Sequence, residues 1–288
     1  GVMARASDAA APQADTAAAR SRLCVHTITT KPWDIDTAID EYARAGVSGI
    51  TIWRNAFEKR TPSEVGARAR DAGLTPVSVC RGGFFPSVDA DARRRAVEEN
   101  RAAIVETAEV GAPLIVLVCG ADPGQPLADS RAQIAAALSE LAPFAREHGV
   151  KLGVEPLHPM YADTRSAINT LGDAIDVCED VGDPAVGVAV DVYHLWWDPR
   201  LETEIERCGR LNRLFAFHVC DWKVPTEDFL NDRGLMGEGC IPIRRIRGCV
   251  EAAGFDGFNE VEIFSDRYWA MDQGGFLSNI IEAYDAHV

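Results

Sequence analysis

The chain has little that would suit a nucleic-acid or a membrane partner. Its 29 lysines and arginines are outnumbered by 44 aspartates and glutamates, and the formal net charge at pH 7 is −15. Proteins that bind a phosphate backbone usually present a basic face, so we expect no nucleic-acid partner. The sequence has no run of about 18 apolar residues, so we expect no transmembrane helix and no membrane partner.

The sequence also lacks paired cysteines, and its first 20 residues lack the features of a signal peptide. None of the eight cysteines forms a C-x-x-C pair, and they are scattered through apolar segments, which indicates reduced, buried side chains and a cytoplasmic protein. Residues 1–20 are rich in alanine and lack the apolar core of a signal peptide. We expect a disordered tail there, with a short docking helix as the alternative, and one domain over residues 21–288.

What the chain does have is an eightfold alternation of short apolar runs with amphipathic segments. One (β/α)₈ barrel takes roughly 250 residues, which the length of 288 accommodates. The fold class expected is therefore α/β, a single (β/α)₈ TIM barrel. A doubly wound open sheet is the rival, but TITTKPW after the first strand is not its glycine-rich fingerprint. The expected strands are residues 23–28, 47–53, 74–80, 114–118, 151–155, 186–190, 213–219 and 257–264.

Four metal-ligating residue types stand at the ends of the last four expected strands. They are Glu155 in LGVEP, Asp191 in VGVAVDVYH, His218 in LFAFHVCD and Glu262 in FNEVEIFS. A parallel barrel gathers its strand ends at one face, so these side chains should converge. A lone glutamate at such a place is usually solvated, but four ligand types on successive strands favour a divalent metal site.

Other side chains are expected around the same barrel mouth. Tryptophan faces suit the C–H faces of sugars, although they also serve as lids. His158 and His194 could equally be hydrogen-bonded loop residues. Arg81 could contact a substrate anion or hydroxyl, or it could pair with the carboxylates. The candidate substrate-binding residues of this group are His26, Trp53, Arg81, His158, His194 and Trp222.

These motifs together resemble a known family. VEP (154–156), VDVYH (190–194), FHVCDW (217–222), the G-E-G-x-I turn from Gly237 to Ile241 and VEIFS (261–265) are similar to the xylose isomerase-like TIM-barrel superfamily, the sugar phosphate isomerases/epimerases. The resemblance runs from Leu23 to about Tyr284. It implies that Glu155, Asp191, His218 and Glu262 bind one divalent ion, with Mn²⁺ expected ahead of Mg²⁺, Co²⁺ and Zn²⁺.

Within that superfamily the ketose epimerase branch uses its two glutamates as acid and base. It also has an arginine in the loop after strand 7 that grips the sugar, and Arg233 in NDRGLMGEG occupies a similar place. The aldose isomerase branch needs a second metal and a lysine, and only Lys31 and Lys223 lie near the expected site. The endonuclease branch needs a basic DNA face, which a net charge of −15 disfavours.

The sequence therefore indicates a metal-dependent isomerase or epimerase of an unphosphorylated sugar or keto-sugar. The ion would polarise a carbonyl, and the two glutamates would move a proton through an enediolate. The alternative is a lyase, dehydratase or C-glycoside deglycosidase-like enzyme on a 3-keto-glycoside or keto-inositol. A non-catalytic sugar-binding barrel is the third reading. A small-molecule sugar is the expected partner, and both a homo-oligomer and a partner subunit are compatible with the chain.

Overall fold

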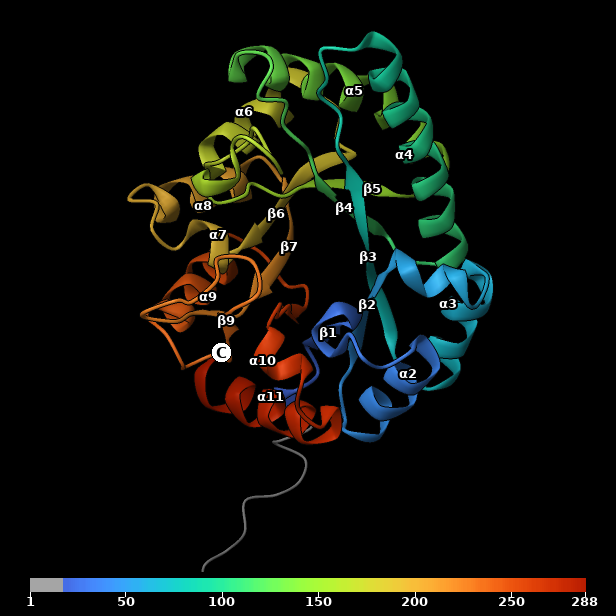
Figure 1. Cartoon of the computed structure of the whole chain (residues 1–288), viewed down its shortest axis with the longest axis vertical. Helices are drawn as coiled ribbons and strands as arrows, with labels where there is room; N and C mark the ends of the chain where they lie inside the picture. Colours follow the sequence, from blue (N-terminus) through green and yellow to red (C-terminus); the bar gives the residue numbers. More distant parts are fainter. Residues whose placement is uncertain (1–17) are drawn as a thin grey trace, which may run out of the picture.

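Eight parallel strands close into a barrel in the computed structural model, which describes residues 18–288 (Figure 1). Each strand pairs with its neighbours in the chain, and β1 closes the ring by pairing with both β2 and β10. The TIM barrel is confirmed, and the open-sheet rival is wrong. The barrel strands are β1 (Leu23–His26), β2 (Gly49–Trp53), β3 (Thr75–Gly83), β4 (Leu114–Val118), β5 (Lys151–Val154), β6 (Val186–Asp191), β7 (Leu214–Val219) and β10 (Asn259–Val261).

A ring of helices surrounds these strands (Figure 1). Local chemistry sets many helix ends: Asp34, Thr61 and Thr170 accept hydrogen bonds from the first turns, and Gly111 and Gly182 end helices at positive φ. The larger helices are α2 (Ile35–Arg44), α3 (Pro62–Asp71), α4 (Ala90–Val110), α5 (Leu127–Glu147), α6 (Leu171–Val181), α8 (Leu201–Arg210), α9 (Ile243–Ala252) and α11 (Gln273–His287). The shorter ones are η1 (Thr27–Thr30), η2 (Arg54–Glu58), η3 (Pro159–Tyr161), α7 (Val192–Leu195) and α10 (Asp266–Trp269).

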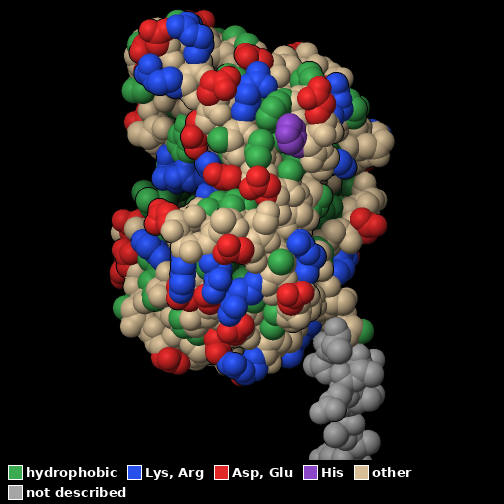
Figure 2. Space-filling model, turned by 90° about the vertical axis from the view of Figure 1, so that its right-hand side faces the viewer, with side chains coloured by type: hydrophobic (Ala, Val, Ile, Leu, Met, Phe, Trp, Pro, Cys, Tyr) green, Lys and Arg blue, Asp and Glu red, His purple; other side chains and the backbone are tan. Residues whose placement is uncertain are grey.

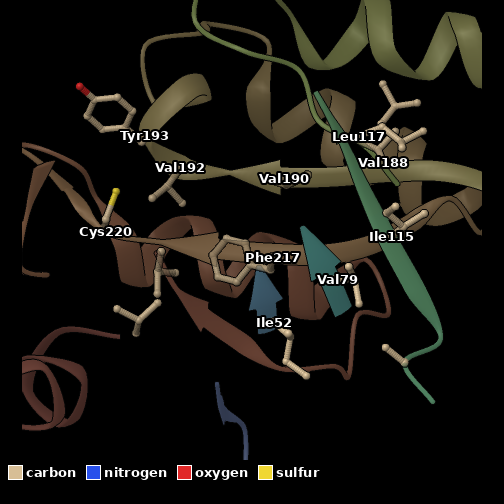
Figure 3. Packing of buried hydrophobic residues seen from close by; sticks show 14 of the residues in the cluster. Ile52, Val79, Ile115, Leu117, Val188, Val190, Val192, Tyr193, Phe217 and Cys220 are labelled. Carbon is tan, nitrogen blue, oxygen red and sulfur yellow. The ribbon is translucent and has the colours of Figure 1, made fainter. Parts of the chain in front are cut away.

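The main apolar core lies between the strands and this ring of helices. Figure 3 shows side chains from several strands. Three of those labelled there, Ile115, Val188 and Phe217, are fully buried. A second, smaller apolar cluster contains Val116 and Ala189, the chain neighbours of core residues. Because successive side chains of a strand point to opposite faces, this second cluster lies inside the barrel.

Some sequence expectations were wrong in detail. Strand 257–264 is only the three-residue β10, so Glu262 lies beyond it. The pairing register of β3 with β2 shifts between Ile50 and Thr51, next to Pro76 of β3. The segment 220–239 contains an antiparallel pair of β8 (Asp221–Trp222) and β9 (Arg233–Gly234), which the sequence analysis did not predict. Burial is not general among the cysteines either, because Cys240 is exposed.

The expected tail lies mostly outside the described residues, since 1–17 are not among them. Its last residue, Arg20, contacts the barrel: the guanidinium donates to both carboxylate oxygens of Asp285 on α11, at 2.5–3.2 Å. Among residues 18–288, no helix combines the length and the apolar character that a bilayer crossing requires.

Candidate metal centre and active site

The four expected ligands meet at the carboxyl ends of their strands. Glu155 directly follows β5, Asp191 is the last residue of β6, His218 lies in β7 and Glu262 directly follows β10. One ligand atom from each lies within 4.8 Å of the other three. All four residues are buried, the most exposed at 5%.

This ligand set fits a divalent cation. The Glu155 Oε2 atom and both ring nitrogens of His218 are buried without a hydrogen-bond partner. His218 Nδ1 lies 3.1 Å from Glu155 Oε2 and 3.5 Å from Glu262 Oε2, without hydrogen-bond geometry. Buried polar atoms are rarely left unsatisfied. Three carboxylates and one imidazole supply the mixed oxygen and nitrogen donors that Mn²⁺ and Zn²⁺ accept.

A second carboxylate layer, which the sequence reading missed, lies beneath the ligands. Glu260 Oε1 accepts hydrogen bonds from His26 Nε2 at 2.9 Å and from Thr51 Oγ1 at 2.7 Å, and it lies 3.6 Å from His218 Nε2. Glu260 is 1% exposed. A signal was present, because Glu260 precedes Glu262 by two residues and alternate residues of a strand share a face.

The packed charges move the pKa values of these groups in opposite directions. Burial alone would lower the pKa of His218, but Glu260 and Glu155 raise it to about 10. Burial would likewise lower the pKa of His26, which Glu262 and Glu260 raise to about 10. Without a metal, both imidazoles therefore hold protons that balance the carboxylates.

The pKa values of the three carboxyl groups in the ligand set also differ from one another. Burial and the neighbouring charge of Glu262 raise the pKa of Glu155 against the influence of His218. Burial raises the pKa of Asp191 as well, although Arg233 opposes the change. Glu262 differs: although burial would raise its pKa, His26 and Arg233 hold it well below the usual range. Such a split between paired carboxyl groups is typical of acid–base sites.

His26 connects the two layers. Its Nδ1 atom lies 2.9 Å from Glu262 Oε2 and 3.2 Å from Trp53 Nε1. These two contacts cannot both be hydrogen bonds, because Nδ1 either carries a proton for Glu262 or accepts one from Trp53. With its pKa raised, His26 donates to Glu262 in the metal-free protein.

Arg233, expected to grip the sugar, is 4% exposed and pressed against the ligands. Its Nη1 donates to Asp191 Oδ2 at 3.1 Å and to Glu262 Oε1 at 3.3 Å. Its guanidinium stacks on the ring of Tyr193, 4.2 Å from the centroid. A substitution of Arg233 is therefore expected to disturb the ligands as well as any substrate.

His194 and His158 form a pair, but only His194 faces the site. The backbone N–H of His158 donates to His194 Nδ1 at 3.1 Å. Burial and Arg233 lower the pKa of His194, so its ring is neutral and the single ring proton resides on Nε2. The 3.3 Å approach of Arg233 Nη2 to that nitrogen is then a contact and not a hydrogen bond. His158 instead stacks on Trp222, with ring centroids 5.3 Å apart.

A pocket opens over the ligands. Of the expected substrate-binding residues, Trp53, Arg81, His194 and Arg233 line it, whereas His26, His158 and Trp222 do not. Its free space is only about 20 Å³, which is room for about one water molecule. Its lining comprises Trp53, Cys80, Arg81, Val116, Val118, Glu155, Leu157, Tyr161, Arg165, His194, Leu230, Arg233, Glu262 and Phe264.

The segment between β8 and β9 closes this pocket, and we call residues 223–232 the lid. Two tyrosines, Tyr161 and Tyr193, both donate their hydroxyl protons to the carbonyl oxygen of Phe229, at 2.9 and 2.5 Å. Leu230 of the lid lines the pocket. A ligand of sugar size needs more room than this pocket has, and we expect the lid to move to admit it.

A larger hollow of about 850 Å³ lies at the other end of the barrel. It is lined by residues at the amino ends of strands, such as Leu74, Leu114 and Phe215. The four candidate ligands are at the carboxyl ends, where TIM-barrel active sites lie. We therefore take the small pocket as the candidate active site.

Comparisons with known proteins agree with the fold. A crystal structure of a Sinorhizobium meliloti 1021 protein superimposes with a TM-score of 0.89 at 42% identity, over 92% of this chain and 98% of that one. The structure of an IolI protein with bound zinc superimposes with a TM-score of 0.79 at 18% identity, over 93% of this chain and 99% of that one. This second similarity shows that the two proteins share a fold.

Curated relatives include inosose isomerases. The protein of Bacillus licheniformis is 27% identical over 65% of this chain and 67% of its own length. That of Halalkalibacterium halodurans is 28% identical over 46% of each, so the chain spans about half of that relative. The sequence model of the family described as xylose isomerase-like TIM barrel matches residues 39–281. The chain therefore belongs to the xylose isomerase-like TIM barrel family.

Proposed function

We propose that the protein is a divalent-metal-dependent isomerase or epimerase of a sugar or keto-sugar. The observation that carries the proposal is the pair Glu155 and Glu262, which belong to one buried ligand set and also line the pocket above it. Two carboxylates at one ligand set can take a proton from a substrate carbon and return it.

The names of relatives support this substrate class. Three curated relatives are inosose isomerases, and two structural neighbours are D-psicose 3-epimerase, with D-fructose, and 3-keto-D-glucoside 4-epimerase of E. coli. The two neighbours are 17% and 18% identical to this chain, so they support the fold directly and the chemistry only as a proposal. The shared theme of the names is a carbonyl-bearing polyol.

Glu155, Asp191, His218 and Glu262 would hold the ion, for which we expect Mn²⁺ ahead of Mg²⁺, Co²⁺ and Zn²⁺. When bound, it would supply Lewis-acid stabilisation of the negative charge that develops on substrate oxygen. The chain's own residues do the rest. One glutamate removes the proton next to the carbonyl, and the other delivers a proton to the opposite face or to the neighbouring carbon.

Neighbouring groups keep these two carboxylates in place. Arg233 holds Asp191 and Glu262 by hydrogen bonds. The Nε2 proton of His194 is the donor available to a substrate oxygen in the pocket. The closed lid excludes bulk water, which strengthens each of these electrostatic contacts.

Turnover in D₂O tests the proposal. A panel of ketoses and inososes is incubated with Mn²⁺-loaded protein, and proton NMR should show deuterium at the carbon next to the carbonyl. Glu262→Gln should retain metal better than Glu262→Ala, since its amide oxygen can still coordinate, yet turnover should collapse. Clean transfer of the original hydrogen without solvent label would contradict the two-glutamate mechanism. An unsaturated or deglycosylated product would establish the lyase alternative.

A further inference from the structure

Two arginines in the pocket wall have no acidic partner. Arg81 lies near the carboxyl end of β3, and Arg165 follows η3; both line the pocket. Neither forms an ion pair with a carboxylate of residues 18–288, and the Nη1 atom of Arg81 is buried with no hydrogen-bond partner. In a chain of net charge −15, two unpaired guanidinium groups side by side indicate a ligand rather than a structural pair.

The two guanidinium groups face the same small pocket. Burial first, and then the charge of Arg165, lower the pKa of Arg81. Like charges that share a partly buried wall repel each other, which destabilises the empty site. An anion held by both would remove that repulsion. Arg233, the third arginine of the wall, is already paired with Asp191 and Glu262 and is not available.

Both side chains are also oriented for planar recognition. The Arg81 guanidinium stacks on the ring of Phe84, 4.5 Å from its centroid, and that of Arg165 lies 5.7 Å from the ring centroid of Tyr161. Stacking restrains the guanidinium plane and leaves its N–H edge free. A carboxylate matches that edge with two parallel hydrogen bonds.

We propose that the substrate of this site is an anionic keto-sugar, a sugar acid whose carboxylate is bound by Arg81 and Arg165. This inference rests on the proposed function and narrows its substrate class. The anionic group is assigned as a carboxylate because a planar carboxylate matches the N–H edges of the two stacked guanidinium groups. A sugar phosphate shares the anionic oxygens but brings about one more negative charge at neutral pH.

Matched ligands test the inference by calorimetry on Mn²⁺-loaded and metal-free protein. D-Tagaturonate differs from D-tagatose only by a carboxylate in place of a terminal CH₂OH, and D-tagatose 6-phosphate provides the phosphate arm. We expect the uronate to bind at least tenfold tighter than the neutral sugar. The Arg81→Gln, Arg165→Gln double variant should reduce this preference by about tenfold to a hundredfold, the usual worth of charged hydrogen bonds.

Arg244→Gln serves as the charge-matched control, since Arg244 is exposed on α9 and distant in sequence from both arginines. It should leave the preference unchanged. Equal affinity for uronate and neutral sugar, stronger binding of the phosphate, or equal loss of both ligands in the double variant would each overturn the inference. Deuterium exchange tests the proposed function separately. Arginine-dependent uronate binding without deuterium exchange would contradict only the reaction, whereas exchange into neutral ketoses without any anion preference would contradict only the substrate class.

Discussion

At the scale of single residues, Glu260 is the side chain whose position says most about the site. Its carboxylate lies between His26 and His218 and so connects one candidate ligand to its neighbour. Glu260 Oε1 is 3.6 Å from His218 Nε2, too far for a hydrogen bond in the metal-free protein, so here it acts on the ligand ring by its charge. A carboxylate behind a metal-binding histidine favours the tautomer with a proton on the facing nitrogen and so orients the ring. Glu260 is therefore a positioning residue, since it reaches the site only through the imidazoles.

The substitution Glu260→Gln should weaken metal binding by about tenfold to a hundredfold, the usual effect of losing such a partner. The shape of the side chain is kept, so the melting temperature of the metal-free protein should change much less than for Glu260→Ala. Competition with a chromophoric chelator measures the affinity. Ser78→Ala is the control, because it removes the 3.3 Å hydrogen bond to Glu260 and the 2.9 Å hydrogen bond to Thr51 but leaves Glu260 beside both imidazoles. An unchanged affinity in Glu260→Gln would show that Glu260 is a structural residue alone.

Metal binding should also release protons. In the metal-free protein the pKa of His218 is about 10, well above its ordinary value of 6.5, so the ring is protonated at pH 8. An imidazole must be neutral to bind a metal, so at least one proton leaves and the affinity should rise about tenfold per pH unit between pH 6.5 and 10. Calorimetry in buffers of different ionisation enthalpy counts these protons. The absence of proton release at pH 8 would contradict the assigned ligand.

The same raised pKa values affect stability without metal. Protonated His26 and His218 stabilise the metal-free fold fully below pH 6.5, and that contribution is lost as the pH rises through about 10.

At the scale of elements, the lid is the part that decides access. Its Phe229 carbonyl accepts from both Tyr161 and Tyr193, so one acceptor atom fastens the lid to two parts of the barrel mouth. Each hydrogen bond contributes about 1 kcal/mol, or roughly a fivefold change in an opening equilibrium.

Phenylalanine at both tyrosines should therefore speed amide hydrogen exchange of residues 223–232 by about five- to twentyfivefold, and it should raise KM more than it lowers metal affinity. Mass spectrometry of peptides from the lid measures the exchange. Tyr284→Phe is the matched control, because its hydroxyl accepts from Asn259 at 3.0 Å and has no contact with the lid. Exchange that is no faster in the double variant would mean that apolar packing, and not the two hydroxyls, holds the lid.

Elements also show what the sequence could and could not predict. The eight strands were predictable because apolar runs such as 114–118 recur between amphipathic helices. The convergence of Glu155 and His218 was also predictable, because each lies at the end of one of the last four barrel strands. The depth of Arg233 was not predictable, because it depends on the pairing of β9 with β8. The partners of Arg81 were likewise left open, since a loop residue such as Arg165 gives no periodic signal.

At the scale of the whole molecule, one metal should change stability measurably. A ligand present at a thousand times its dissociation constant stabilises a fold by about 4 kcal/mol. For a domain of this size we expect a rise of roughly 10 °C in Tm between chelator-treated and Mn²⁺-loaded protein. Differential scanning calorimetry measures it.

The Asp191→Ala, His218→Ala double variant is the control for that shift. It should fold, because the apolar core between the strands and helices is untouched, and its Tm should not depend on added Mn²⁺. A metal-dependent Tm that persists in the double variant would place the ion elsewhere.

One side chain lies close to both ends of the barrel interior. Glu260 lies directly beneath the candidate ligands, and it also lines the 850 Å³ hollow at the opposite end. Its side chain therefore stands between the ligand set and the solvent in that hollow. We expect Glu260→Ala to open a path for water from this hollow to the ligand set. The charge of Glu260 orients the imidazoles, and the volume of its side chain keeps water away from the ligands.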